Sequence, residues 1–554
     1  MSWGGRASDA ARGRAVRVGL ASYLGWRICR WCLHAASSRV ARRRYRRELA
    51  RLRAAYLARH SYGAQGGPRS PRSPRSPRSP SASEMSRGNS LASIGEDGWG
   101  AEEAGPGSPG SEGTWREHPL RVMVLYASVG NGHKRAGEAC VAALEELRDP
   151  NGLAPEVKCL DVVEFMSHEG RFVYKSAFLT LTQSLAGQHM LGFFYDAQQD
   201  PSDAFQAGVK RTMNATFCAR LVREVYAFLP DVIVNTHYLP ADITAQLRGY
   251  PDFSVPSCTV VTDYDVQAIW VQDPTERYFV AREDVRLVLE SFGVDRASTT
   301  VSGIPIMPEF RQAAEDAARD RAGVRRGLGL EEEGRAGGRP LVVVASNGPK
   351  SIRRTYPEIL KAAEPMEVVV LMGRQADTRD ELLSVPVPDR HKVHLWGFTS
   401  KMPQLLACAD LFVGKPGGLT VAEALALGVP MLITDPIPGQ ESRNADMLLE
   451  MGAGVKVSDP CLLAHRLDGL LGQRGARLRR MRDAIEESGI GRPVAAQDVA
   501  RWALAAGAMH RGRVLRLEPD EVATPEGGLA TPLPKGDRIL PPSTPGTPRE
   551  ALLF

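Results

Sequence analysis

The sequence predicts an α/β protein with two doubly wound parallel sheets, each covered by helices. Three observations lead to this class. Short β-branched runs alternate with helical patterns from about residue 119 to residue 510. The alternation breaks at the polar stretch 312–340 and then restarts, and in each half a Gly-rich turn follows a strand and opens a helix. We therefore expect two domains facing a central cleft, because ligands of such sheets bind beyond the carboxyl ends of the strands.

The first 60 residues form an Arg-rich leader. They contain fifteen Arg, no Lys and two acids, a net charge of +13, which leaves −7 for the rest of a chain whose total is +6. The body of the protein therefore lacks the basic excess of a nucleic-acid binder, and we expect no nucleic-acid partner. An Arg-rich, Ser-containing and acid-poor leader is typical of an organelle transit peptide that is cleaved or disordered. An amphipathic helix on a membrane surface is the alternative.

Two further segments have too few apolar side chains to build a core. Residues 61–117 include the repeat "RSPRSPRSPRSP", and the tail 513–554 is rich in Pro, Gly and Ser/Thr-Pro pairs that could be phosphorylated. We predict that both are disordered. No window reaches the ~18 apolar residues of a spanning helix, so any membrane contact should be peripheral. The eight Cys show neither zinc-ligand spacing nor a dense disulfide framework, and we expect reduced thiols and no metal.

The first domain, residues 118–311, begins with a strand and a Gly-rich turn. We expect its strands at 121–127, 231–236, 257–263, 277–281 and 299–305. After the first strand comes "ASVGNGHKRAGEA", and a buried helical stripe then follows at Ala136, Ala139, Cys140, Ala143, Leu144 and Leu147. Gly130 and Gly132 allow close backbone approach, and the amides at the helix start favour an anion or a polar headgroup. His133 is placed to accept a proton from an alcohol as a neutral imidazole, although a capping or packing role is the alternative.

The second domain, residues 341–492, repeats the pattern and is followed by a C-terminal helix at 493–512. Its strands are expected at 341–346, 367–372, 392–397, 410–414 and 430–434. The fourth strand leads into "GKPGGLTVAEALALG", where Gly417 and Gly418 would let a diphosphate approach the start of a helix. Lys415 could neutralise that diphosphate or be a surface lysine. Further along, Glu423 is suited to ribose hydroxyls.

A tight turn in "DPIPGQESRNAD" follows the fifth strand of the second domain. It carries Gln440 and Glu441, whose side chains are suited to bridging the vicinal hydroxyls of a sugar. A bare Gly-Gly turn occurs by chance, but this ordered series of Gly-Gly turn, acid and Gln-containing turn rarely does. The residues alone thus point to a sugar nucleotide.

The span from about 119 to 510 resembles the monogalactosyldiacylglycerol synthase and diacylglycerol glucosyltransferase family, relatives of the cell-wall enzyme that adds N-acetylglucosamine to a lipid-linked muramoyl peptide. The resemblance is carried by "SVGNGHKRAGEA", "VVTDYDVQAIWVQDPTERYFVA", "VSGIPIMPEF", "WGFTSKMPQLLACADLFVGKPGGLTVAEALALGVPM" and "IPGQESRNA". It implies the GT-B fold of two Rossmann-like domains, inversion at the anomeric carbon, and no metal or other cofactor in the active site.

The resemblance also implies roles for single residues. His133 and its turn would lie at the acceptor hydroxyl, with Asp263 as a second candidate for the base or as the group that orients His133. Phe398 would present its backbone to uracil, and Gln440 would hold the hexose. The diphosphate loop would be Ser346, Asn347 and Gly348. Two departures from the family pattern stand out, since Ser442 replaces a second acid after "PGQE" and the loop "ASNGPK" is poor in glycine.

Residues 171–199 are unusually aromatic for a linker between a helix and a strand. They include Phe172, Phe178, Phe193 and Phe194, with Arg171 and Lys175 nearby. The resemblance implies that this region enters a bilayer to collect diacylglycerol, with contact to anionic lipids. A buried core helix is the alternative.

These expectations lead to one favoured function and its rivals. The favoured function is transfer of galactose from UDP-galactose to diacylglycerol at the surface of an organelle membrane, for which we expect a plastid envelope. Glucose as donor sugar is the close rival. Two alternatives differ more from the favoured function: a UDP-sugar epimerase on the same fold, and an inactive lipid-binding scaffold. The sequence leaves the oligomeric state open.

Overall fold

The computed structural model describes residues 118–168, 218–330 and 339–514, apart from 129, 251–252, 346–347 and 374–376, and the single residues 51 and 171. The predicted leader and tail therefore lie almost entirely, and the linker 61–117 wholly, outside the described residues. The aromatic segment 171–199 is described at Arg171 alone.

The first sheet has six strands in the order β2-β1-β3-β4-β5-β6. Each neighbouring pair is parallel. Because β2 and β3 flank β1 on opposite sides, the strand order reverses there, and the loops after β1 and β3 meet at a topological switch point. The strands are β1 (Arg121–Tyr126), β2 (Glu156–Asp161), β3 (Val232–Asn235), β4 (Ser257–Val260), β5 (Arg277–Val280) and β6 (Thr299–Val301).

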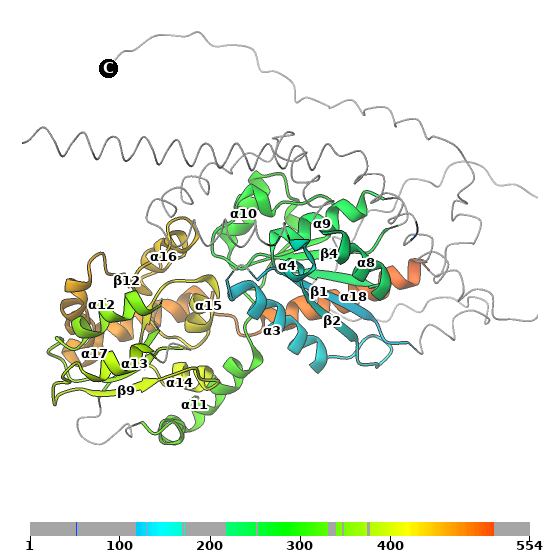
Figure 1. The fold of residues 1–554 in the computed structure, drawn as a ribbon. Coiled ribbons are helices and arrows are strands. Elements are labelled where there is room, and N and C mark those ends of the chain that lie inside the picture. The colour runs from blue at the N-terminus through cyan, green and yellow to red at the C-terminus, as the bar shows by residue number, and fades with distance from the viewer. Residues whose placement is uncertain are drawn as a thin grey trace, which may run out of the picture. The chain divides into compact units, whose positions relative to one another are not determined.

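Helices cover both faces of the first sheet. One core cluster packs helix α3 (Gly132–Glu146) and the final helix α18 (Ala495–Val514) against one face, where the two helices lie side by side (Figure 1). The other face carries α4 (Val162–Phe165), α8 (Ala219–Phe228) and α9 (Tyr238–Arg248). The predicted stripe on α3 is confirmed, since its Ala and Cys residues and Leu144 are buried and only Leu147, at the C-cap, is half-buried.

The second sheet also has six parallel strands, in the order β12-β11-β10-β7-β8-β9. Its order reverses between β7 and β10, so the loops after these strands form the switch point of this sheet. The strands are β7 (Leu341–Ala345), β8 (Glu367–Leu371), β9 (Lys392–Trp396), β10 (Leu411–Gly414), β11 (Met431–Ile433) and β12 (Gly454–Lys456).

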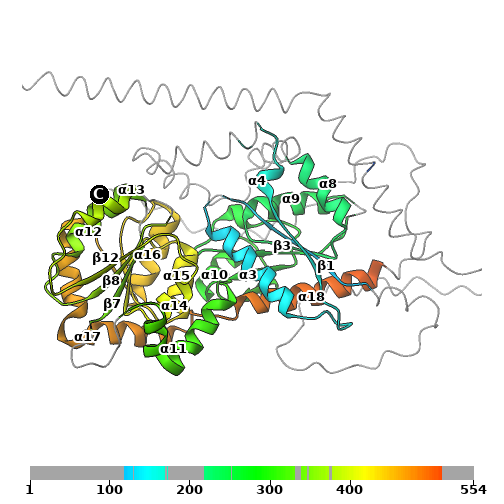
Figure 2. The same ribbon diagram turned by 60° about the horizontal axis from the view of Figure 1, so that its bottom comes forward.

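The helices of the second domain again fall on two faces. Figure 2 shows α12 and α17 on one side of the strands and α14, α15 and α11 on the other, in agreement with two separate core clusters. The chain thus has the GT-B architecture, with two doubly wound sheets and a last helix that returns to the first. The helices are α11 (Pro308–Gly327), α12 (Pro349–Ile359), α13 (Asp377–Leu383), α14 (Met402–Ala407), α15 (Gly418–Ala426), α16 (Gln440–Glu450) and α17 (Leu463–Ser488).

All ten predicted strands are present, and the structure adds β2 and β12. Both additional strands lie at an edge of their sheet, and their side chains are mostly half-buried or exposed. Charged residues interrupt β2, "EVKCLD", and β12 has only three residues, so neither stands out in the sequence. The segment 312–340, expected as a break, contains most of α11, which packs against α14.

Arg511 fastens α18 to the first sheet. Its guanidinium donates to both carboxylate oxygens of Asp231 and to the carbonyl oxygens of His118 and Pro119, the latter two at 2.7 and 2.8 Å. Asp231 also accepts from the backbone N of Arg121 at 2.7 Å. The C-terminal helix is therefore joined to the starts of β1 and β3 and belongs to the folded unit.

A buried charge cluster lies at the start of β8. Glu367, fully buried, accepts from Arg325 of α11 at 2.8 Å and from Nε2 of His394 at 2.9 Å. Lys392 Nζ lies 3.7 Å from the same carboxylate. Removing water from both Arg325 and Glu367 is costly, so each charge depends on the other.

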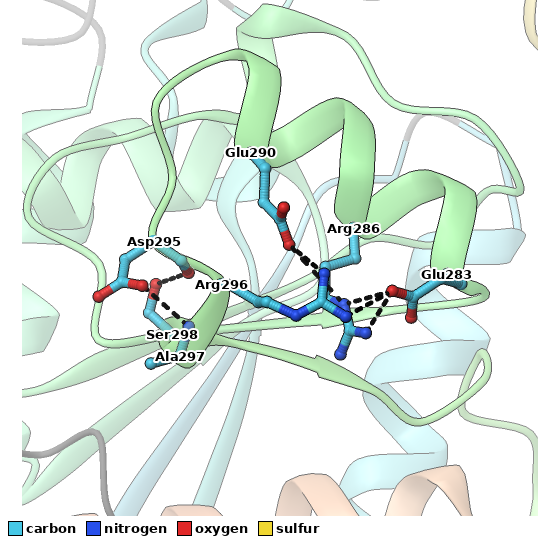
Figure 3. Close-up of polar contacts among 7 residues, drawn as sticks. All are labelled: Glu283, Arg286, Glu290, Asp295, Arg296, Ala297 and Ser298. Atoms are coloured by element: carbon cyan, nitrogen blue, oxygen red, sulfur yellow. Dashed lines mark hydrogen bonds and ion pairs between the residues drawn. The ribbon is translucent and has the colours of Figure 1, made fainter.

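A second charge network, by contrast, lies on the surface around α10 (Glu283–Ser291). Glu283 accepts from Arg286 and Arg296, and Arg296 also reaches Glu290 at 2.9 Å (Figure 3). These side chains are largely in contact with solvent, where ion pairs contribute little to stability. We regard this network as a solvated helix surface and not as a functional site.

Candidate active site

The turn after β1 needs a glycine at its first glycine position, and its second glycine, Gly132, begins α3. Gly130 has φ of +86°, in the left-handed region that favours glycine. Ser128 N donates to Asp161 Oδ1 at 3.1 Å, which holds the start of the turn. Asn131, the N-cap of α3, makes no side-chain cap hydrogen bond, so the first amides of that helix have no capping side chain.

His133 is held through Nδ1. This atom lies 3.2 Å from the carbonyl oxygen of Thr236 and 2.8 Å from Oγ1 of Thr262. The Thr236 hydroxyl donates in turn to the carbonyl oxygen of His133 at 2.8 Å. Because a carbonyl oxygen only accepts, we assign the proton of the neutral ring to Nδ1. Nε2 then carries the lone pair that a general base needs.

The surroundings of His133 keep its ring neutral. His237 packs edge-on against it with ring centroids 4.4 Å apart, and Trp270 lies at 6.2 Å. Burial lowers the pKa of His133 to about 4, against a smaller opposing effect of the Thr236 carbonyl. A base with this pKa is unprotonated throughout the physiological pH range.

We predict that catalysis stays constant as the pH is lowered from 8 to 5 and declines only near pH 4. Protonation of His133 removes the lone pair, and the neutral form is favoured because the pKa is lowered to about 4. The check is kcat at saturating UDP-sugar across this range. An acidic limb centred near the ordinary histidine pKa of about 6.5 would contradict the neutral, buried base.

Asp263 makes hydrogen bonds to α16 and none to His133. It accepts hydrogen bonds from the side-chain amides of Gln440 and of Asn444, the latter at 3.3 Å, whereas Nδ1 of His133 contacts Thr236 and Thr262. Burial raises the pKa of Asp263 well above its ordinary value. The carboxyl group therefore couples the end of β4 to α16, close to where a donor sugar is expected.

The Gly-Gly turn opens α15 as predicted, and its second glycine is required by packing. A Cβ on Gly418 would lie 2.2 Å from the carbonyl oxygen of Thr262, so no larger residue fits. Lys415 is paired with Glu441 at 2.8 Å, and the other oxygen of Glu441 accepts from Ile437 N at 2.9 Å. Glu441 thus supports the turn and positions Lys415, and its contact with sugar hydroxyls stays a prediction.

Glu423, inside α15, is a carboxylate without a hydrogen-bond partner among the described residues. Its side chain is half-buried, and burial raises its pKa to about 7, with Arg135 acting in the opposite direction. A desolvated acceptor of this kind costs stability unless a ligand satisfies it. The contact of Glu423 with ribose hydroxyls stays a prediction.

Replacing Glu423 by Ala should weaken UDP binding about ten- to hundredfold. The carboxylate would lose its hydrogen bonds to the ribose, which are worth roughly 1.5 to 3 kcal/mol. Titration calorimetry with UDP gives the affinity. The UDP affinity of Glu423→Gln, which keeps one acceptor oxygen, should lie between those of the wild-type protein and the Ala variant. Unchanged affinity in the Ala variant would rule out the ribose contact.

The other two described residues expected to bind the sugar nucleotide follow two further strands of the second sheet. Gly348, with φ of +107°, stands just before α12 in the loop after β7, and Phe398, 73% exposed, follows β9. Ser346 and Asn347 lie outside the described residues. The predicted membrane residues Phe172, Phe178, Phe193 and Phe194 also lie outside them.

Four residues at the site were not predicted as functional: Thr236, His237, Thr262 and Asn444. The first two follow β3, and the strand order that makes β3 a neighbour of β1 was not available from the pattern. Asn444, fully buried, accepts from Tyr264 N at 3.1 Å and donates to Pro416 O at 3.1 Å. A polar pair directly after a buried strand, as in "VNTH", is the signal that could have found Thr236 and His237.

The described residues contain neither a membrane-spanning helix nor a cluster of metal-binding side chains. No helix among them is long and apolar enough to cross a bilayer. They also contain no group of three or more His, Cys, Asp or Glu side chains arranged to bind a metal ion.

Comparison with known proteins gives matches over both domains. The family model "Monogalactosyldiacylglycerol (MGDG) synthase" matches residues 133–306, and "Glycosyltransferase family 28 C-terminal domain" matches residues 341–484. The processive diacylglycerol beta-glucosyltransferase of Bacillus subtilis (strain 168) is 25% identical over 374 residues, which cover 66% of this chain and 91% of the relative. The enzyme of the same name from Staphylococcus saprophyticus is 26% identical over 355 residues, 61% of this chain and 82% of the relative. Among solved structures, Acinetobacter baumannii MurG aligns with 70% of this chain and 100% of that chain at 15% identity and a TM-score of 0.43.

Proposed function

Because the chain belongs to the monogalactosyldiacylglycerol synthase and diacylglycerol glucosyltransferase family of glycosyltransferases, we propose that it transfers a hexose from a UDP-sugar to diacylglycerol at a membrane surface. The observation that carries this proposal is the state of His133. Its Nδ1 is held by Thr236, and its Nε2 presents a lone pair at the switch point of the first sheet. A neutral base of this kind suits an alcohol as the acceptor.

The proposed reaction is a single displacement. The free hydroxyl of diacylglycerol attacks C1 of the hexose, its proton passes to Nε2 of His133, and the bond from C1 to the diphosphate oxygen breaks. UDP leaves with the electron pair of that bond. The N-terminus of α15 at Gly417 and Gly418, together with Lys415, stabilises the negative charge on the diphosphate. We expect no metal requirement, so EDTA should leave the rate unchanged.

We propose galactose as the transferred sugar. The family model for monogalactosyldiacylglycerol synthase covers residues 133–306, the domain that carries His133. Glucose is the second candidate, because the relatives at 25% and 26% identity are named glucosyltransferases. The two sugars differ only at one hydroxyl, which would meet Gln440 and its neighbours.

The test uses the full-length protein with vesicles that contain diacylglycerol and either UDP-galactose or UDP-glucose. We expect a glycosyl diacylglycerol, identified by mass spectrometry and chromatography, from UDP-galactose. Product from UDP-glucose alone would change the sugar and leave the reaction class intact. Conversion of the UDP-sugar without any lipid product would favour an epimerase, and no conversion at all would favour a lipid-binding scaffold.

We also propose that the protein works peripherally on a plastid membrane with anionic lipids. The Arg-rich leader supports import into an organelle, and the aromatic segment 171–199 with its basic neighbours supports contact with a bilayer. Flotation of the protein with vesicles of neutral or anionic composition, and import of a fluorescent fusion to residues 1–117, would test the two parts separately.

A further inference from the structure

A second imidazole stands beside the base. His237 directly follows Thr236, the residue that holds Nδ1 of His133, and its ring meets that of His133 edge-on with centroids 4.4 Å apart. His237 also contacts Tyr238 and Trp270, at 4.1 and 6.0 Å between ring centroids. The mechanism above assigns no task to this buried, polar ring.

The hydrogen bonding of His237 determines which nitrogen carries its proton. Nδ1 accepts from the backbone N of Leu239 at 3.0 Å and thereby caps the start of α9. A backbone N–H only donates, so Nδ1 is unprotonated and the proton of the neutral ring is on Nε2. Burial, with a smaller effect of His133, lowers the pKa of His237 well below its ordinary value, so the ring stays neutral.

The two imidazoles therefore have opposite hydrogen-bonding roles at Nε2. Nε2 of His133 accepts, whereas Nε2 of His237 donates. Neither nitrogen makes a hydrogen bond to a described residue, since the hydrogen bonds of both rings are made through Nδ1. His133 is half-buried and His237 is 3% exposed, and because the two rings are in contact, a ligand bound at His133 lies next to the ring of His237.

We propose that His237 binds the acceptor lipid by donating its Nε2–H to the ester carbonyl on the carbon next to the reacting hydroxyl. This inference rests on the proposed function. In 1,2-diacylglycerol a hydroxyl and an ester occupy neighbouring carbons. The hydroxyl donates to Nε2 of His133, and the ester carbonyl, which only accepts, matches Nε2–H of His237. Tyr238 and Trp270 supply apolar surface beside these contacts.

Two variants separate this contact from the capping of α9. His237→Asn keeps an acceptor near the position of Nδ1, and Asn is a favoured N-cap, but it removes the donor at Nε2. His237→Gln places an amide N–H close to the position of Nε2. The melting temperature and the UDP affinity of both variants report whether the fold and the donor domain are preserved.

The experiment compares two acceptors in vesicles: 1,2-diacylglycerol, and its analogue with an ether in place of the ester at carbon 2. For the wild-type protein, kcat/KM should be about tenfold higher for the ester, the equivalent of one hydrogen bond. His237→Asn should lose about tenfold on the ester and little on the ether, so that the ratio approaches one. His237→Gln should restore part of the ratio.

If His237 has a purely structural role, its replacement would lower kcat/KM equally for both acceptors and leave the ratio of the two values unchanged. That result would overturn the proposal. Equal use of both acceptors by the wild-type protein would also overturn it, and so would an effect confined to the KM of the UDP-sugar. These results are distinct from failure of the proposed function, in which the wild-type protein makes no glycolipid from either acceptor.

Discussion

His133→Ala should lower kcat by about 10²- to 10⁴-fold, the usual contribution of a positioned base. The variant loses the lone pair at Nε2, and the hydroxyl of diacylglycerol must then attack without a group to take its proton. UDP-sugar affinity should hardly change, because Glu423 and the start of α15 lie in the other domain. Steady-state kinetics with vesicle-bound diacylglycerol, together with calorimetry for UDP, separates the two effects.

Asp263→Asn is the matched comparison for His133→Ala. Because Asp263 accepts from Gln440 and Asn444, we expect its replacement to act mainly on the KM of the UDP-sugar. A His133→Ala protein with near-normal kcat, alongside an inactive Asp263→Asn protein, would move the base to Asp263. His133 would then be a structural residue of the turn.

Glu367→Gln should destabilise the fold by about 3 kcal/mol, because it leaves Arg325 buried without its carboxylate. Arg325 and Glu367 are 1% and 0% exposed, so water cannot take the place of the lost charge. Urea unfolding of the full-length protein measures the change. A loss below about 1 kcal/mol would mean that the pair is effectively solvated.

The double variant Arg325→Met, Glu367→Leu provides the control for this pair. Replacing both charges of a buried pair by apolar side chains of similar size is often neutral or stabilising. The double variant should therefore recover most of the stability that Glu367→Gln loses. If it is as unstable as the single variant, the cost comes from packing around β8 and not from an uncompensated charge.

Most of the fold could be predicted from local patterns, and two edge strands were missed. Strands that are buried on both faces read as continuous apolar runs, as in "VIVN" of β3 and "LVVVA" of β7. The edge strands β2 and β12 gave no such run, because charged residues interrupt β2 and β12 has only three residues, one of them a Lys. The pairing of Arg325 with Glu367 joins residues 42 positions apart, which periodicity alone does not reveal.

The candidate site was predictable where a turn motif carries the chemistry, and not where the order of strands creates it. His133, Gly418 and Glu423 stand in motifs that are contiguous in the sequence. Thr262 and His237 act on His133 because β1, β3 and β4 are neighbours in the sheet, although these residues are far apart in the chain. The hydrogen bonds of Asp263 to Gln440 and Asn444 likewise join residues far apart in the chain, so the sequence did not reveal them.

The central claim is that the acceptor hydroxyl, deprotonated by His133, displaces UDP directly from C1 of the hexose. The most direct test is the anomeric configuration of the glycolipid, read from the coupling constant of the anomeric proton by NMR. UDP-hexoses carry an α bond at C1, so one displacement predicts a β-linked glycosyl diacylglycerol. An α-linked product would require a second displacement or a different mechanism, and it would contradict the assignment of His133 as the base for direct attack.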